Sequence, residues 1–403
     1  MSDRLGVPSL PSFLPSSLCQ HLLCCGAVRT EALFVLRAVI FSQCVFTRGR
    51  CESLVISERK EVGLQIRTYS NNLGSYEVFL VAGVRIIIKH CYAADRGAHT
   101  AAVMDLNDAK TRNHELVPHK GFKLINGTHD PDDVDQIYNL EIRESDVFVV
   151  TYPKSGTIWM QQILLLLESK GDVTAFSKLN NSSNGDLIPW IELNGNRQAF
   201  ITAPSPRLRV THLQHQFMPS ALGQKKGKVI YVARNPKDVL VSYFHFHKLA
   251  NMLETPKDFN DFFEKFMRGD VFGCSWFHHI KTWYSRKDDM NMLFITYEEM
   301  IQDLESAVKK ISLFLGKELT DEQLANVVKH STFNNMRKIP QASYEQVPGD
   351  LLNHHQGRFM RKGTIGDWKN HFTVAQNERF DEVFYREMKD FPLSFIWDIR
   401  DIE

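Results

Sequence analysis

The sequence predicts an α/β protein in which a single three-layer domain, with a central and mainly parallel sheet flanked by helices, occupies residues 104–403. Short β-branched apolar runs alternate with segments of helical length, as a parallel sheet with crossover helices requires. A glycine-containing loop at residues 151–157 stands directly between the first apolar run and a helix pattern. Hydrophobic residues make up 43% of the 403-residue chain, enough for a large core. These observations together favour one doubly covered sheet.

Four apolar runs bounded by polar or turn residues are the predicted strands. They cover residues 146–152, 207–213, 228–234 and 292–297. Such continuous apolar runs are typical of strands that are buried on both faces in parallel sheets. Ligands of open parallel sheets bind beyond the carboxyl ends of the strands, so we expect the functional site at that edge.

Helix patterns lie between and after these strands. They cover residues 159–168, 236–251, 259–267, 274–286, 305–315 and 322–329. Pro236 suits the first turn of the second helix, and Asn235 before it is a candidate N-cap. No internal repeat accompanies this alternation.

Residues 1–103 do not share the alternating pattern and are predicted to form an irregular or poorly ordered extension. Its apolar runs at residues 32–46 and 76–89 each contain an arginine and are shorter than the roughly 20 residues that a membrane helix needs. The start lacks a basic segment followed by a clean apolar one, so no signal peptide is expected either.

Charge and cysteine usage exclude several classes of function. A formal net charge of +1 argues against a nucleic-acid binder and against a membrane-surface protein. Of seven cysteines, only Cys274 lies beyond residue 103, so we expect a reduced, cytoplasmic domain. Four potential metal ligands lie close together in the extension: Cys19, His21, Cys24 and Cys25. Because no second ligand pair follows at zinc-finger spacing, unpaired thiols are favoured and no metal is expected.

The stretch Thr151–Trp159 has the chemistry of a phosphate-binding loop. Gly156 lets backbone N–H groups close on an anion, Lys154 supplies charge, and Ser155 and Thr157 supply hydroxyls. In the usual nucleotide loop, Gly-x4-Gly-Lys-Ser/Thr, the lysine follows the second glycine, whereas Lys154 precedes Gly156. A magnesium-bound triphosphate and a kinase of that type are therefore not expected.

Two further stretches add positive charge. Arg234–Ser242 follows the third predicted strand, and its two end residues would converge on a second phosphate. Residues 358–369 place four basic residues, two glycines and a tryptophan in twelve positions. Alone, each stretch would also fit a solvated surface, but two glycines in the second one indicate close backbone approach.

Together, these three stretches resemble the motifs of the cytosolic sulfotransferases, which use 3'-phosphoadenosine 5'-phosphosulfate (PAPS) as donor and release 3'-phosphoadenosine 5'-phosphate (PAP). The resemblance covers roughly residues 113–403 and implies the P-loop-like fold of that family. It implies that the donor is bound by Lys154, Ser155, Gly156, Thr157, Ile158, Trp159, Arg234, Ser242, Tyr297, Ser331, Phe333, Met336, Phe359, Arg361, Lys362 and Gly363. In isolation, the aromatic members of this set would fit core packing equally well.

The resemblance also assigns catalytic roles to His212 and Lys154. A lone histidine is more often packed or exposed, but Thr211-His212 after a strand matches the family's general base, and imidazole titrates in a suitable range. Lys154 would stabilise charge during transfer. Many members have a lysine where this chain has Val210, so Lys154 would carry more of that charge.

The acceptor is less well defined than the donor. By resemblance, Trp190, Phe246 and Tyr344 line its pocket, an aromatic set that suits an aryl amine, a phenol or a steroid alcohol. Residues 157–164 and 392–398 are most similar to the amine sulfotransferase branch. The alternative hypothesis is a PAPS- or PAP-binding protein with little or no transferase activity, which the presence of His212 and Lys154 disfavours.

A self-association motif is also indicated by the resemblance. Lys369–Glu378 fits the family's Lys-x3-Thr-Val-x3-Glu dimer motif, an apolar pair flanked by opposite charges that is able to pair about a two-fold axis. The competing interpretation is an exposed helix start with Thr373 as its cap. We expect a homodimer.

Overall fold

A computed structural model of the chain describes residues 65–71, 74–81, 84–90, 103–105, 115–177 and 182–401. The chain divides into two compact units, Met1–Asn107 and Asp108–Glu403. The cysteine and histidine group between Cys19 and Cys25 and the apolar run at residues 32–46 lie outside the described residues.

The first unit contains one described sheet, with strand order β1-β2-β3-β4 and antiparallel pairing throughout. The strands are β1 (Gln65–Asn71), β2 (Gly74–Val81), β3 (Val84–His90) and β4 (Val103–Asp105). All but β4 lie within the residues that the sequence predicted as an irregular extension. The sequence pattern predicted none of these strands.

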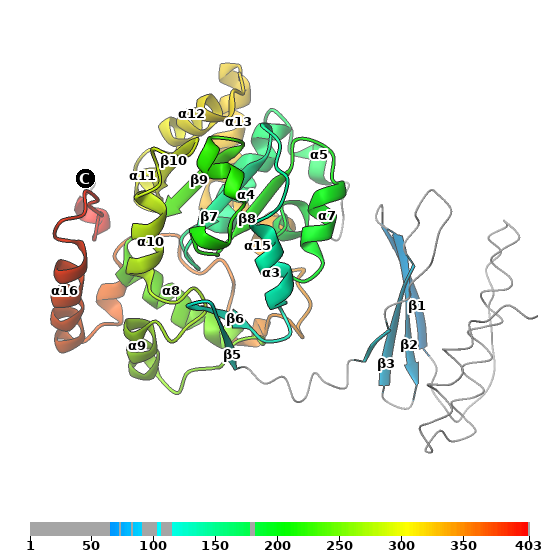
Figure 1. Cartoon of the computed structure of the whole chain (residues 1–403), viewed down its shortest axis with the longest axis horizontal. Coiled ribbons are helices and arrows are strands. Elements are labelled where there is room, and N and C mark those ends of the chain that lie inside the picture. The colour runs from blue at the N-terminus through cyan, green and yellow to red at the C-terminus, as the bar shows by residue number, and fades with distance from the viewer. Residues whose placement is uncertain are drawn as a thin grey trace, which may run out of the picture. The chain divides into compact units, whose positions relative to one another are not determined.

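The second unit is built on a parallel sheet with the strand order β10-β9-β7-β8 (Figure 1). Its strands are β7 (Val147–Thr151), β8 (Leu208–Thr211), β9 (Lys228–Ala233) and β10 (Met292–Thr296). From β7 the chain crosses to β8 on one side, whereas from β9 it crosses to β10 on the other. The crevice between the carboxyl ends of β7 and β9 is therefore the switch point at which open α/β sheets bind ligands.

Helices cover both faces of this sheet, as predicted (Figure 1). Phe148 and Val150 pack into a core shared with α8 (Pro236–Leu249), α9 (Phe259–Arg268) and α10 (Trp276–Tyr284). Val147 and Val149 pack into a second core shared with α4 (Thr157–Glu168), α12 (Leu304–Leu315) and α13 (Asp321–Ser331). Successive residues of β7 thus face opposite sides, and all five are buried. The predicted three-layer α/β class is confirmed.

The helices are short to medium in length. Those of eight or more residues are α4 (Thr157–Glu168), α8 (Pro236–Leu249), α9 (Phe259–Arg268), α10 (Trp276–Tyr284), α12 (Leu304–Leu315), α13 (Asp321–Ser331) and α16 (Val374–Met388). The shorter ones are α3 (Pro131–Ile137), α5 (Thr174–Ser177), α6 (Asn184–Leu187), α7 (Asn196–Thr202), α11 (Tyr297–Gln302), α14 (Phe333–Met336) and α15 (Pro340–Ser343). A hairpin of β5 (Leu116–His119) and β6 (Phe122–Ile125) precedes them.

Predicted and observed helix limits differ by a few residues where the backbone is left-handed. Gly156 is the N-cap of α4 with φ 109°, so the helix begins at Thr157 rather than at residue 159. Cys274 has φ 58° and Ser275 caps α10 through its side chain, so that helix begins at Trp276 rather than at residue 274. Asn235 is the N-cap of α8 with Pro236 in its first turn, as predicted.

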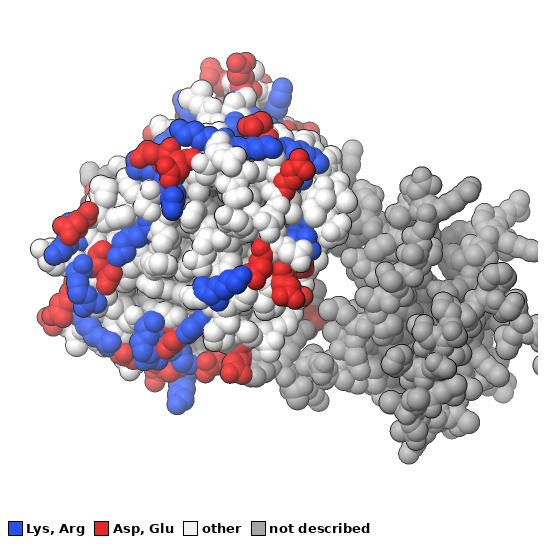
Figure 2. Space-filling model, in the orientation of Figure 1, with Lys and Arg blue, Asp and Glu red and all other residues white. Residues whose placement is uncertain are grey.

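The surface of the second unit carries charges of both signs. On the face shown in Figure 2, basic and acidic side chains of this unit are interspersed. Within the described part of the chain, no helix has the length and apolar character that crossing a bilayer demands.

Candidate active site

The loop that follows β7 turns into α4 at the switch point of the sheet. Lys154 and Gly156 both have left-handed backbone conformations, with φ 70° and 109°. A side chain at Gly156 would place its Cβ 3.1 Å from Cδ2 of Tyr297, so only glycine fits without displacing that ring. Met160 makes the first hydrogen bond within α4, to Gly156, which leaves the preceding N–H groups for an anion at the helix start.

The ammonium group of Lys154 lies between two aromatic rings. Its Nζ is 4.1 Å from the ring centroid of Phe246 and 3.9 Å from that of Phe359. Both distances are within the range of cation–π attraction. Burial, together with the positive charges of Arg234 and Arg361, lowers the pKa of Lys154 to about 7. An anion bound beside it would restore the charged form.

His212 follows β8 and is held in one tautomer. Its Nδ1 lies 2.8 Å from the backbone oxygen of Thr151, which only accepts, so Nδ1 carries the ring proton. Nε2 is consequently free to accept a proton. Burial lowers the pKa of His212 to about 4, so the ring is neutral near pH 7. A neutral imidazole of this kind is suited to general-base chemistry.

Two buried side chains fix the backbone at His212. Oε1 of Glu192 accepts its backbone N–H at 2.8 Å, and Nε2 of His279 donates to its carbonyl oxygen at 3.2 Å. His279 in turn accepts from the Tyr231 hydroxyl through Nδ1, at 2.9 Å. His279 is fully buried. Neither Glu192 nor Tyr231 was predicted from the sequence.

Arg234, at the end of β9, connects three parts of the site. It donates to the backbone oxygens of Lys154 at 3.1 Å and Thr364 at 3.3 Å, and its guanidinium lies 4.2 Å from the centroid of Tyr297. Its Nε is buried and, within the described residues, has no hydrogen-bond partner. A buried donor of this kind indicates a missing acceptor.

The basic segment near the C-terminus is held against the start of α8 by Asp238. Its two carboxylate oxygens accept the N–H groups of Gly366 at 2.7 Å and Trp368 at 3.0 Å. Arg361 and Lys362 in this segment pair with Asp367 at 2.6 and 2.5 Å. Burial acts to raise the pKa of Asp367, but hydrogen bonds, of which that from Lys362 is the strongest, outweigh it and lower the pKa.

An aromatic platform lies beside this segment. Trp159 and Tyr297 meet edge to face with centroids 5.1 Å apart, and the indole N–H of Trp159 donates to the backbone oxygen of Ser331 at 2.7 Å. Gly363 has φ 66°, and a Cβ there would lie 2.2 Å from the ring of Phe333. The backbone at Gly363 therefore packs directly on that ring.

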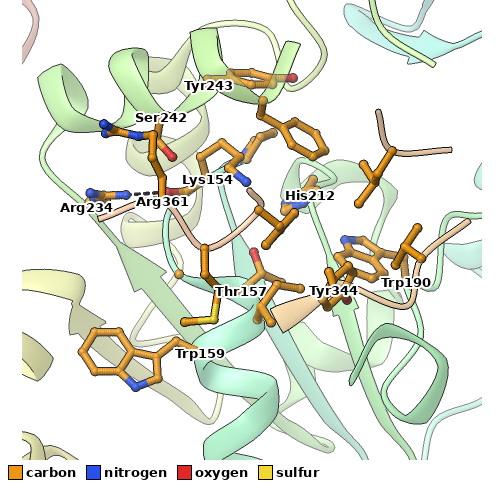
Figure 3. Close-up of a pocket in the computed structure, with 18 of the residues that line it drawn as sticks. Lys154, Thr157, Trp159, Trp190, His212, Arg234, Ser242, Tyr243, Tyr344 and Arg361 are labelled. Atoms are coloured by element: carbon orange, nitrogen blue, oxygen red, sulfur yellow. Dashed lines mark hydrogen bonds between the residues drawn. The ribbon is translucent and has the colours of Figure 1, made fainter. Parts of the chain in front are cut away.

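Residues from each of these segments line one cavity with a volume of about 370 Å³. Figure 3 shows Lys154 and His212 between Arg234, Ser242 and Arg361 on one side and Trp190 and Tyr344 on the other. The predicted site residues that line it are Lys154, Gly156, Thr157, Ile158, Trp159, Trp190, His212, Arg234, Ser242, Phe246, Tyr297, Phe333, Met336, Tyr344, Phe359, Arg361, Lys362 and Gly363.

Two predicted residues do not line the cavity. The hydroxyl oxygens of Ser155 and Ser331 are buried instead, and neither has a hydrogen-bond partner within the described residues. Conversely, sequence reasoning missed His129, Glu192 and Phe272, which line the cavity near His212. No motif in their local sequence identifies these residues, because only the tertiary fold brings them to the site.

Across the described ranges, no three His, Cys, Asp or Glu side chains gather as metal ligands would.

Comparison with known proteins places these features in a family. Residues 144–392 match the family model described as the sulfotransferase domain. The chain is 45% identical over 288 residues to the amine sulfotransferase of Oryctolagus cuniculus, covering 71% of this chain and 95% of that protein. It is 42% identical over 285 residues to sulfotransferase 2B1 of Mus musculus, covering 70% of this chain and 83% of that protein.

Solved structures agree with this result. Mouse sulfotransferase SULT7A1, complexed with PAP, superposes with a TM-score of 0.57 at 32% identity, covering 68% of this chain and 95% of that one. Retinol dehydratase, in a complex with retinol and PAP, superposes with a TM-score of 0.57 at 27% identity, covering 69% and 90%.

Proposed function

Because this chain belongs to the sulfotransferase family, we propose that it transfers a sulfonate group from PAPS to an amine or hydroxyl of a small hydrophobic acceptor. The observation that carries the proposal is the shared cavity. Lys154 and His212 line it between a basic, phosphate-binding side and an aromatic side. A donor and an acceptor bound on the two sides would meet at these residues.

The basic side fits a donor with phosphates at both ends of a ribose. The loop around Lys154 and the start of α4 would hold the 5' group, while Arg234, Ser242 and Arg361 would hold the 3'-phosphate. The buried and unpaired Nε of Arg234, which lines the cavity, is a donor that such an oxygen would satisfy. When bound, PAPS supplies the sulfonate and a phosphate leaving group.

The chain's own residues would act on the acceptor and on developing charge. His212 would accept the acceptor's proton at Nε2, because Nδ1 is engaged with Thr151. Lys154 would stabilise negative charge from its place beside Phe246 and Phe359. Val210 is fully buried in the apolar core and, as an apolar residue, adds no second charge to that of Lys154.

A transfer assay tests this function against the binding-protein alternative. Radiolabelled PAPS would be incubated with the full chain and with single amines, phenols and sterols, and the labelled product separated. We expect transfer to at least one acceptor class. PAP binding without transfer to any acceptor would favour the donor-binding alternative. No observation on the described residues supports that alternative.

Replacement of Gly363 by alanine is expected to weaken PAP binding selectively. The new Cβ would meet the ring of Phe333 at 2.2 Å in a left-handed backbone, so the ring or the loop must move. Overpacking costs about 1–3 kcal/mol, which corresponds to roughly 5- to 150-fold in Kd. Titration calorimetry with PAP measures it, with Gly349→Ala as a control because a Cβ there meets nothing within 4 Å. Equal affinities of the two variants would contradict the packing argument.

We also propose that the protein is a cytoplasmic homodimer that uses Lys369–Glu378. Thr373 caps α16, and the next residue, Val374, is 76% exposed. An apolar side chain presented at a helix start suits pairing about a two-fold axis. Sedimentation at micromolar concentration is expected to show a dimer for the natural chain and a monomer for Val374→Glu. A monomeric natural chain would refute the proposal.

A further inference from the structure

Glu192 is brought beside His212 by a short extension of the sheet. The segment that contains it runs parallel to β8, with a bridge between Trp190 and Val210. Ile191 donates to the Val210 backbone oxygen at 3.0 Å, and Val210 donates to Pro189 at 3.1 Å. This pairing carries Glu192 to the same edge of the sheet as the catalytic histidine.

The carboxylate of Glu192 is half satisfied. The residue is only 1% exposed, and Oε1 accepts the backbone N–H of His212 at 2.8 Å. Oε2 is buried and has no hydrogen-bond partner within the described part of the chain. Burial raises the pKa of Glu192 to about 7, although hydrogen bonds from the His212 N–H and the Thr211 side chain act to lower it. An unpaired oxygen of this kind is costly in a folded protein unless a ligand satisfies it.

The position of Glu192 in the cavity indicates the charge of that ligand. Among the described residues that line the cavity, Glu192 is the one carboxylate. The cationic lining residues are Lys154, Arg234, Arg361 and Lys362, which belong to the phosphate-binding side. The neighbouring lining residues add no charge near pH 7, because Phe272 and Leu193 are apolar and burial lowers the pKa of His129 to about 4. A cation on the acceptor side would therefore find its partner at Glu192.

Proton balance makes this carboxylate useful for one class of acceptor. A hydroxyl acceptor loses one proton during transfer, whereas an alkylammonium acceptor must lose two. The first leaves R–NH3⁺ before attack and frees the nitrogen lone pair. The second leaves as the N–S bond forms and the S–O bond breaks, its electron pair departing with the leaving phosphate. His212 supplies one proton acceptor, so an ammonium substrate needs another.

We propose that Glu192 binds the ammonium group of alkylamine acceptors through its unpaired Oε2 and takes their first proton, leaving the second to His212. This inference rests on the proposed sulfonate transfer and adds a cationic amine to the acceptor classes. Glu192 is thus an acceptor-recognition residue for amines. For alcohols and phenols its role is limited to positioning the backbone of His212.

The decisive variant is Glu192→Gln, which keeps an oxygen for the His212 N–H but removes the charge. Turnover would be measured with phenethylamine, which is cationic at pH 7, and with phenethyl alcohol, its neutral counterpart. We expect kcat/KM for the amine to fall at least about 30-fold, as for loss of a buried charge partner, and that for the alcohol to change less than about threefold. Equal losses for both acceptors would reduce Glu192 to a positioning residue and overturn the proposal.

A binding measurement gives a readout independent of transfer. Calorimetric titration of PAP-loaded protein with phenethylamine should show at least about tenfold weaker binding for Glu192→Gln, while phenethyl alcohol binds both proteins alike. Unchanged amine affinity would contradict the proposal. If the natural chain transfers to the alcohol but never to the amine, this inference fails and the sulfotransferase function stands. Transfer to neither would count against both.

Glu298 offers a matched control. Its Oε1 also accepts a backbone N–H, from Asn235 at 2.9 Å, and its Oε2 is also buried without a partner among described residues. Burial likewise raises its pKa to about 7. Glu298 does not line the cavity, so Glu298→Gln should leave the ratio of amine to alcohol turnover unchanged. A shift in that ratio as large as that of Glu192→Gln would overturn the assignment to Glu192.

Discussion

Replacing His212 with alanine is expected to lower turnover by about 10²- to 10⁴-fold, the range that a positioned general base contributes. The reason is geometric. Nδ1 is committed to the Thr151 carbonyl at 2.8 Å, which leaves Nε2 as the proton acceptor in the cavity. The side chains proposed to bind the phosphates lie on other elements, so PAP affinity should change little.

Steady-state kinetics with a fixed acceptor and calorimetry with PAP would measure the two effects of this substitution. His278→Ala is the control, because His278 is exposed on α10 next to the buried His279. The control variant should retain the turnover of the natural chain. Undiminished turnover of His212→Ala would remove this residue from the catalytic role, whereas lost PAP binding would indicate a structural one.

The sheet and the basic segments that line the cavity could be predicted because their signals are local in sequence. The predicted strand at 228–234 and β9, Lys228–Ala233, differ by one residue, since a β-branched run bounded by polar residues is self-contained. Residues 151–159, 234–242 and 358–369 are each continuous segments. Folding then brings these three segments together at the carboxyl edge of the parallel sheet.

On the acceptor side, Trp190, Phe246 and Tyr344 were predicted and line the cavity, but Glu192 and His129 could not be found in the same way. Glu192 reaches His212 only because its segment pairs with β8. The sequence around Glu192 does not indicate that β8 is its neighbour. His129 enters the cavity from the turn between β6 and α3. A single buried carboxylate or imidazole shows no sequence periodicity and no characteristic spacing to other functional residues. Such residues can therefore be identified only from the tertiary structure. For the same reason, the sequence did not distinguish amine, phenol and sterol acceptors.

Replacing Lys154 with alanine is expected to reduce turnover by about 10²- to 10³-fold, as loss of a preorganised charge-stabilising group does. The effect should be at the upper end because Val210 provides no second charge. The same substitution should also abolish the proton uptake that accompanies PAP binding. Burial beside Arg234 and Arg361 lowers the pKa of Lys154 to about 7 in the free protein, and a bound anion favours the charged form.

The sign of this linkage follows from the two states of the amine. Above pH 7 the free protein holds Lys154 largely neutral, and PAP binding must recharge it by taking up as much as one proton. Affinity for PAP should accordingly fall as pH rises from 7 to 9. Calorimetry at pH 8 in buffers of different ionisation enthalpy measures the uptake. It should vanish in Lys154→Ala and persist in Lys362→Ala, which removes a neighbouring charge but leaves Lys154 in place. Uptake that survives in Lys154→Ala would show that another group binds the proton.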